Sequence, residues 1–114
     1  MDVKMLPLGK DTYPVAYGMN CLGEICEDLG VDFFGAGFKM GIKGTIVAIH
    51  RGIQEGCMRQ GIKFNLTRRE VGGILEDNFE QAPAFTTLFY GSIAEVSGKI
   101  IAAEEKLPPE ETKS

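Results

Sequence analysis

The most constraining feature of this sequence is a set of apolar residues that recurs every three or four positions in its middle. Because an α-helix repeats every 3.6 residues, this spacing places the apolar side chains on one face of a helix that ends before Gly61. The polar residues between them are expected on the solvent side. The apolar set is Ile42, Ile46, Ile49, Ile53 and Cys57, and the polar set is Lys43, His50, Arg51, Gln54 and Glu55.

A second helix is predicted upstream, over residues 19–29, with Asn20 near its N-terminal cap and Gly30 as its stop. Its acidic residues are expected on a solvated face. The apolar stripe is Met19, Leu22, Ile25, Cys26 and Leu29, and the acidic residues are Glu24, Glu27 and Asp28.

Two further helices are predicted downstream. Thr67 and Glu70 have the spacing of a capping box, in which each side chain bonds the backbone N–H of the other residue. Pro83 is suited to the first turn of a last and longest helix, which a Leu-Pro-Pro sequence at 107–109 ends. The apolar face of that helix comprises Phe85, Leu88, Phe89, Ser92, Ile93, Val96, Ile100 and Ala103.

The N-terminal residues alternate in polarity instead. Residues 3–8 and 12–17 are short extended segments separated by a Gly-Lys-Asp sequence, which indicates a β-hairpin. A two-stranded sheet is marginal in water, so this hairpin must pack on the helices. The sequence therefore predicts a mainly α, α+β domain over residues 1–106, in which an N-terminal hairpin packs on about four helices. A disordered acidic tail is expected over 107–114.

Composition narrows the classes of function. The chain of 114 residues carries a net charge of −4, with a pI near 5.0 and no strong basic cluster, which disfavours nucleic-acid binding. Its start has no apolar run typical of a signal peptide, and no stretch reaches the length of a membrane span. Three cysteines without a C-x-x-C motif are expected to be free thiols. We therefore expect a cytoplasmic protein that does not bind membranes.

Catalytic residues are not apparent in the sequence. His50 is the only histidine and is expected to be exposed and structural. Cys21 and Cys26 point in different directions on one helix, so packing is a better explanation for them than zinc binding. We accordingly predict no catalytic, metal or cofactor site, and no enzyme.

The residues that best suit a binding surface are aromatic and methionine side chains in and after a glycine-rich segment, residues 31–41. Exposed apolar patches of this kind mark protein-binding surfaces, although the same side chains could instead complete the core. The predicted protein-binding residues are Phe33, Phe34, Phe38 and Met40, joined by Met58 and Tyr90.

A helix-turn-helix regulator that binds DNA is the alternative function. Residues 66–72, with Arg68 and Arg69, resemble the start of such a motif. A recognition helix should follow, but residues 82–87 offer no base-reading side chain beyond hydroxyls. The alternative is therefore the weaker hypothesis.

The order of these elements carries a family resemblance. A hairpin leads into the helix of residues 19–30, then into the isoleucine-rich helix, the Leu-Thr-x-x-Glu-Val-Gly cap at 66–72 and a final helix. Over about residues 3–105 the chain resembles the small tail assembly chaperones of long-tailed bacteriophages and prophages. The resemblance implies a non-enzymatic protein in the bacterial host cytoplasm, which binds the apolar tape measure protein and helps the tail tube protein to assemble around it. Weak self-association is also expected, since several copies along one tape measure would gain by avidity.

Overall fold

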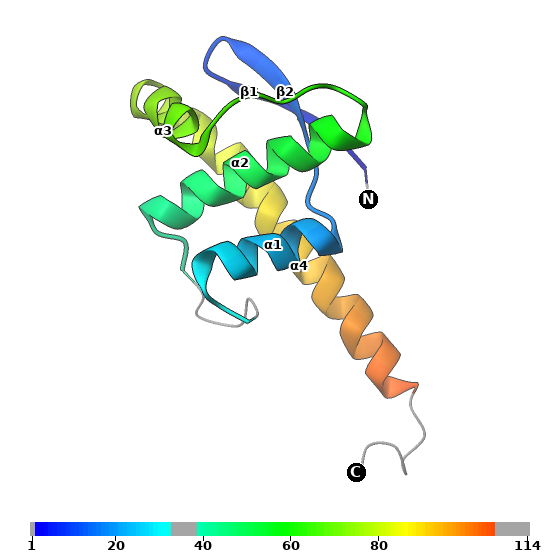
Figure 1. Cartoon of the computed structure of the whole chain (residues 1–114). Helices are drawn as coiled ribbons and strands as arrows, with labels where there is room; N and C mark the ends of the chain where they lie inside the picture. The colour runs from blue at the N-terminus through cyan, green and yellow to red at the C-terminus, as the bar shows by residue number, and fades with distance from the viewer. Residues whose placement is uncertain (1, 33–38, 107–114) are drawn as a thin grey trace.

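The computed structural model describes residues 2–32 and 39–106; the predicted tail and the three predicted phenylalanine positions at 33, 34 and 38 lie outside these ranges. It confirms an α+β fold in which an N-terminal hairpin packs on helices (Figure 1). The elements follow the chain as β1 (Lys4–Leu8), β2 (Asp11–Val15), α1 (Met19–Leu29), α2 (Ile42–Arg59), α3 (Arg68–Asp77), the 3-10 turn η1 (Phe79–Gln81) and α4 (Ala82–Glu105).

The hairpin is antiparallel, and Leu6 pairs with Tyr13 at its centre. Gly9 adopts a positive φ of 67° in the turn between the strands. Its N–H donates to Gln81 Oε1 at 2.6 Å, and Gln81 Nε2 donates to the Gly9 carbonyl at 3.1 Å. The tip of the hairpin is thereby fixed to the residue before α4. Strand β2 ends before its predicted limit because the Ala16 N–H bonds the Gly52 carbonyl of α2 instead.

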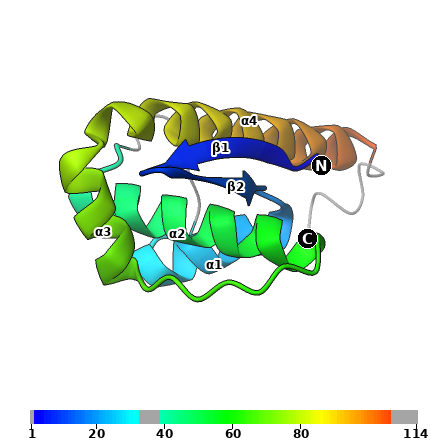
Figure 2. The same ribbon diagram turned by 90° about the horizontal axis from the view of Figure 1, so that it is seen from above.

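Helix α2 lies at the centre of the fold, where it contacts α1, α3, α4 and β2. The hairpin lies on one side of α2 and α4 (Figure 1), so it is seen between them in the view from above (Figure 2). Its predicted apolar face is buried at Ile49, Ile53 and Cys57. At the N-terminal end of α2 the face emerges from the core, and Ile42 is 85% exposed. The apolar spacing therefore predicted the helix correctly. It did not predict that the first turn of the helix lies outside the core.

Close packing of β2 on α2 depends on glycines. A Cβ at Gly52 would lie 2.5 Å from Tyr17 Cζ, and a Cβ at Gly56 would overlap the backbone carbonyl of Pro14. The Tyr17 hydroxyl donates to the Ala48 carbonyl at 2.8 Å. Only glycine, which has no Cβ atom, allows the strand to approach the helix this closely.

The helix ends mostly follow the predicted signals. Gly30 closes α1 in the left-handed conformation, with φ 69°. Both bonds of the capping box between Thr67 and Glu70 are present. The cap of α1 is Gly18 and not Asn20, so the prediction for Asn20 was wrong.

The core is aromatic where α4 meets the rest of the fold. Phe85 and Phe89 are fully buried, and the Phe89 ring meets Tyr17 edge-on with centroids 5.5 Å apart. Such T-shaped pairs add to the free energy of burial. The first half of α4 is thus an integral part of the core.

The second half of α4 is different. At 24 residues the helix is about 36 Å long. Its buried residues are Ala82, Phe85, Phe89 and Ser92, and none of the residues of α4 after Ser92 is buried. Figure 1 shows this end of α4 projecting away from the rest of the molecule.

Candidate protein-binding groove

A cluster of charged residues ties three helices together. Arg51 on α2 binds Asp28 on α1 in a bidentate manner, with Nε 2.7 Å from Oδ2 and Nη2 3.2 Å from Oδ1. Arg68 at the start of α3 also donates to Asp28. The hydrogen bond from Arg51 lowers the pKa of the Asp28 carboxyl below its ordinary value. Asp28 and Arg51 therefore do not lie on solvated faces as predicted, and they have a structural role.

His50 also departs from its prediction. It is half-buried, its Nε2 lies 2.9 Å from the Leu66 carbonyl oxygen, and its ring stacks obliquely on Phe64 with centroids 5.2 Å apart. Nδ1 is buried without a hydrogen-bond partner among the described residues. Burial lowers the pKa of His50 from its ordinary 6.5. This histidine anchors the segment before α3, in contact with a carbonyl and an aromatic ring.

Mild acid is expected to destabilise the fold through His50. The pKa of His50 is lower in the folded state, so the unfolded chain binds the proton more readily. The contribution of the neutral His50 to stability is therefore complete above pH 6.5, and it is lost as the pH falls through the pKa of the folded state. The free energy of unfolding in urea should decrease between pH 7.5 and pH 5, by less than the limit of about 1.4 kcal/mol per pH unit for one proton. In His50→Gln, whose amide can donate to Leu66, this decrease should disappear. An equal decrease in the variant would show that another group titrates.

The cysteines are free and two of them are buried. The Cys21 thiol lies 3.5 Å from the Arg51 carbonyl, and burial raises its pKa to about 12. Burial also raises the pKa values of Cys26 and Cys57. All three are therefore thiols at neutral pH. Within residues 2–32 and 39–106, no three His, Cys, Asp or Glu side chains are grouped in a way that could hold a metal ion.

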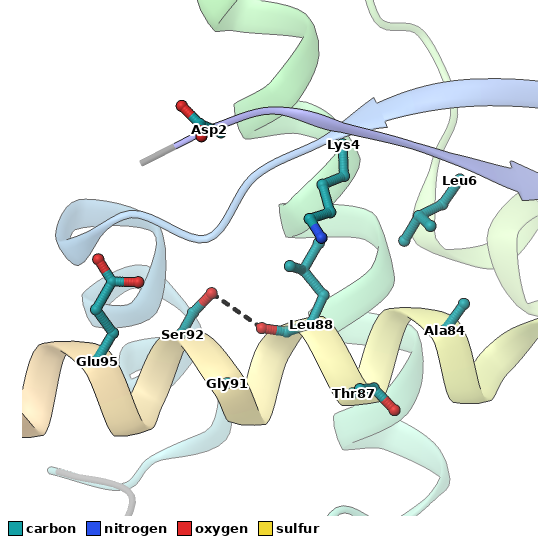
Figure 3. Close-up of a pocket in the computed structure, with 9 residues that line it drawn as sticks. All are labelled: Asp2, Lys4, Leu6, Ala84, Thr87, Leu88, Gly91, Ser92 and Glu95. Atoms are coloured by element: carbon teal, nitrogen blue, oxygen red, sulfur yellow. Dashed lines mark hydrogen bonds between the residues drawn. The ribbon is translucent and has the colours of Figure 1, made fainter.

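A cleft of about 680 Å³ lies between β1 and α4 (Figure 3). Asp2, Lys4 and Leu6 line it from the strand side, and Ser92 lines it from α4. The Ser92 hydroxyl donates to the Leu88 carbonyl of its own helix at 2.9 Å, as the dashed line shows. The only histidine of the chain lies on α2 and is bonded to Leu66. No histidine lines the part of this cleft that the structure describes.

The predicted binding residues that the structure describes do not form one patch. Met40 is half-buried against the core just before α2, whereas Met58 is 65% exposed near the end of that helix. A helix of this length separates its ends by about 27 Å. Tyr90, on α4, is 41% exposed and rests edge-on against Phe89.

A different surface gathers apolar side chains from two helices. It is a groove of about 460 Å³ between α1 and the projecting end of α4, called here the α1/α4 groove. Residues of α1 line it at positions i, i+3, i+4 and i+7, which is one face of a helix, and residues of α4 line it along a similar stripe. Its lining residues are Met19, Leu22, Gly23, Cys26, Asp32, Ile93, Val96, Ser97, Ile100, Ile101 and Glu104.

Large apolar side chains in this groove are open to solvent. Met19 is 59% exposed, Ile100 49% and Ile101 55%. The sequence pattern places Met19 and Ile100 on apolar helix faces that suit a core, but neither residue is buried. Met19 lies in the first turn of α1, and Ile100 lies in the part of α4 that projects from the fold. Ile101 was outside the predicted stripe. Adjacent helical residues can share one core, as Val47 and Ala48 do, so the sequence carried no signal that marked Ile101 as exposed.

A second apolar hollow lies between the start of α2 and α3. Met40, Ile42, Ile46, Leu75 and Phe79 contribute to it. Ile42 and Phe79 are 85% and 66% exposed. Of the predicted binding residues that the structure describes (Met40, Met58 and Tyr90), only Met40 lines this hollow, and none lines the α1/α4 groove.

Comparison with family models, with curated proteins and with solved structures gave no match for this chain. Across the part of the chain that the structure describes, none of the helices combines the length and apolar character needed to cross a bilayer. The surface geometry is therefore the main basis for a functional hypothesis.

Proposed function

We propose that this protein is a non-enzymatic assembly chaperone that shields an apolar helix of a partner in the α1/α4 groove. The supporting observation is the exposure of Met19, Ile100 and Ile101 along a groove between two helices. Leaving such side chains in water costs free energy, about 25 cal/mol for each Å² of apolar surface. A partner that buries these side chains recovers that free energy.

The groove suits a helix better than an extended peptide. Two helical stripes line it, and a third helix can place its own apolar stripe between them, as in other helix-in-groove complexes. An extended peptide would need an unpaired strand edge for backbone hydrogen bonds, and neither α1 nor α4 offers one.

The partner that we propose is the tape measure protein of a long-tailed phage or prophage, in the cytoplasm of the bacterial host. This proposal follows from the resemblance of residues 3–105 to tail assembly chaperones. A tape measure protein is long, helical and apolar, so it needs shielding before the tail tube protein assembles around it. Several weakly associating copies would hold it through avidity.

The alternative, a DNA-binding regulator, gains no support from the arrangement of its arginines. Arg68 donates to Asp28, so it is engaged within the fold. Arg69 is exposed next to Glu70 of the capping box. A mobility-shift assay with a DNA duplex separates the two functions, since a regulator would bind with steep salt dependence.

Co-purification with a tape measure fragment tests the proposed function. The double variant Ile100→Ser/Ile101→Ser should reduce capture at least about tenfold, because it removes two exposed apolar contacts at the groove. Ile62→Ser is the matched control, since Ile62 is 48% exposed in a loop outside the groove. Unchanged capture by the double variant would overturn the assignment of the groove, and absence of capture by the native protein would overturn the proposed partner.

A further inference from the structure

The charged side chains that line the α1/α4 groove are acidic. Asp32 and Glu104 line the groove, and Glu27 is exposed on α1. Among the described residues none of these three carboxylates has an ion-pair partner. Over residues 2–32 and 39–106, no lysine or arginine lines the groove.

Three basic residues on the surrounding helices pair with other carboxylates. Arg59, whose guanidinium lies beside Gly18, pairs with Glu55 at 2.7 Å. Arg51 is engaged with Asp28 and Glu24. Lys99 lies about 120° around α4 from Ile93 and pairs with Glu95 at 3.5 Å. The groove therefore combines an apolar floor with an acidic rim.

From this combination we propose that the occupant of the groove is an amphipathic helix whose apolar stripe is flanked by lysine or arginine. The inference rests on the proposed function and adds the chemistry of the partner. Complementary charge speeds encounter and selects against wrong partners. A second copy of this chain is a poor occupant, because its own groove would bring Asp32, Glu104 and their neighbours against like charges.

The dimensions of the groove set the length of the recognised helix. From Ile93 to Glu104 the stripe on α4 extends about 16 Å, and from Met19 to Cys26 the stripe on α1 extends about 10 Å. A partner helix of about three turns covers both. Its apolar residues should recur at i, i+3 or i+4, and i+7, with the basic residues on either side of that stripe.

Two synthetic helical peptides test this inference on the full chain. Both carry the same leucine stripe; one has lysine at every flanking position and the other has glutamate. Fluorescence anisotropy at low salt should show about tenfold tighter binding of the lysine peptide, the effect of two or three exposed ion pairs. The difference should shrink near 0.5 M salt, where charges are strongly screened. Ile100→Ser/Ile101→Ser should weaken both peptides.

Charge reversal distinguishes the rim from the net charge of the protein. Asp32→Lys/Glu104→Lys should abolish or invert the preference for the lysine peptide. The matched control is Glu76→Lys/Glu80→Lys, which changes the net charge equally at exposed positions outside the groove and should retain the preference. Equal behaviour of the two double variants would overturn the inference.

The outcomes also separate this inference from the proposed function. Capture of a tape measure fragment through Ile100 and Ile101, with no preference between the peptides, would leave the proposed function standing and refute the basic flanks. Preference for the lysine peptide without capture of tape measure would refute the proposed partner alone. A dimer of the native chain that dissociates on Ile100→Ser/Ile101→Ser substitution would identify a second copy as the occupant and refute the inference.

Discussion

Gly56→Ala is expected to lower the free energy of unfolding by about 3 kcal/mol. A methyl group at this position would overlap the Pro14 carbonyl and approach the Val15 nitrogen. These are backbone atoms of β2, so they cannot rotate away as a flexible side chain could. The gain in helix propensity, about 1 kcal/mol, offsets only part of this cost. Urea unfolding followed by circular dichroism measures the effect.

Gly73→Ala is the matched control. Gly73 lies in α3 with no atom near its Cβ position, so alanine there should stabilise the protein by up to about 1 kcal/mol. The same substitution thus has opposite signs at two helical glycines. If Gly56→Ala were as stable as the native protein, β2 could not lie against α2 as described.

Asp28→Asn is expected to cost about 2 kcal/mol. The substitution keeps the shape of the side chain but leaves Arg51 and Arg68 without their shared carboxylate. The Asp28 side chain is only 15% exposed and its partners are 22% and 40% exposed, so the cost lies between that of an exposed pair and that of a buried one. Unfolding in urea at pH 7 measures it.

Glu27→Gln controls for the loss of one negative charge on the same helix. Glu27 is exposed, and among the described residues it has no ion-pair partner, so its substitution should change the stability by less than about 0.5 kcal/mol. The effect of Asp28→Asn should also disappear in acid. Since the pKa of Asp28 is lowered from 3.8 in the folded state, its contribution is present above that value and is lost as the pH falls below it. Equal stability of the two variants would show that the cluster contributes little.

Elements whose signals are local could be predicted from the sequence. The spacing of Ile49, Ile53 and Cys57 fixes a helical face, and Gly30 and Thr67 carry the backbone preferences of helix ends. Asn20 failed as a cap because a glycine two residues earlier fills that position. Preferences of this kind depend on neighbours in sequence, which is why they can be read without coordinates.

Tertiary roles of charged residues could not be predicted in the same way. On the helical pattern Glu55 belongs to the solvent side, yet it is only 8% exposed, and its bond from Arg59 Nε at 2.7 Å lies within α2 itself. His50 contacts Leu66, which lies 16 residues further along the chain. Asp28 binds Arg51 and Arg68, which lie 23 and 40 residues away. A periodic pattern describes one helix and gives no information on which other element comes to lie beside it.

The groove was missed for a related reason. Met19 and Ile100 occur in apolar stripes that look like core faces, and only the relative lengths and placement of α1 and α4 leave them uncovered. The predicted binding site was placed at residues 33–40 because phenylalanines between glycines are conspicuous in a sequence. Whether Phe33, Phe34 and Phe38 bind a partner stays a prediction, since they lie outside the described residues.

The bonds between Gly9 and Gln81 have a consequence for synthesis of the chain on the ribosome. They join residues 72 positions apart, and the strands that they hold are finished long before Gln81 is made. At about 5–20 residues per second, the nascent hairpin waits roughly 3–13 seconds for that anchor. An isolated hairpin is barely stable, so the first strands should pair only once α2, on which β2 packs, has been made, and their turn should be fixed only when Gln81 follows.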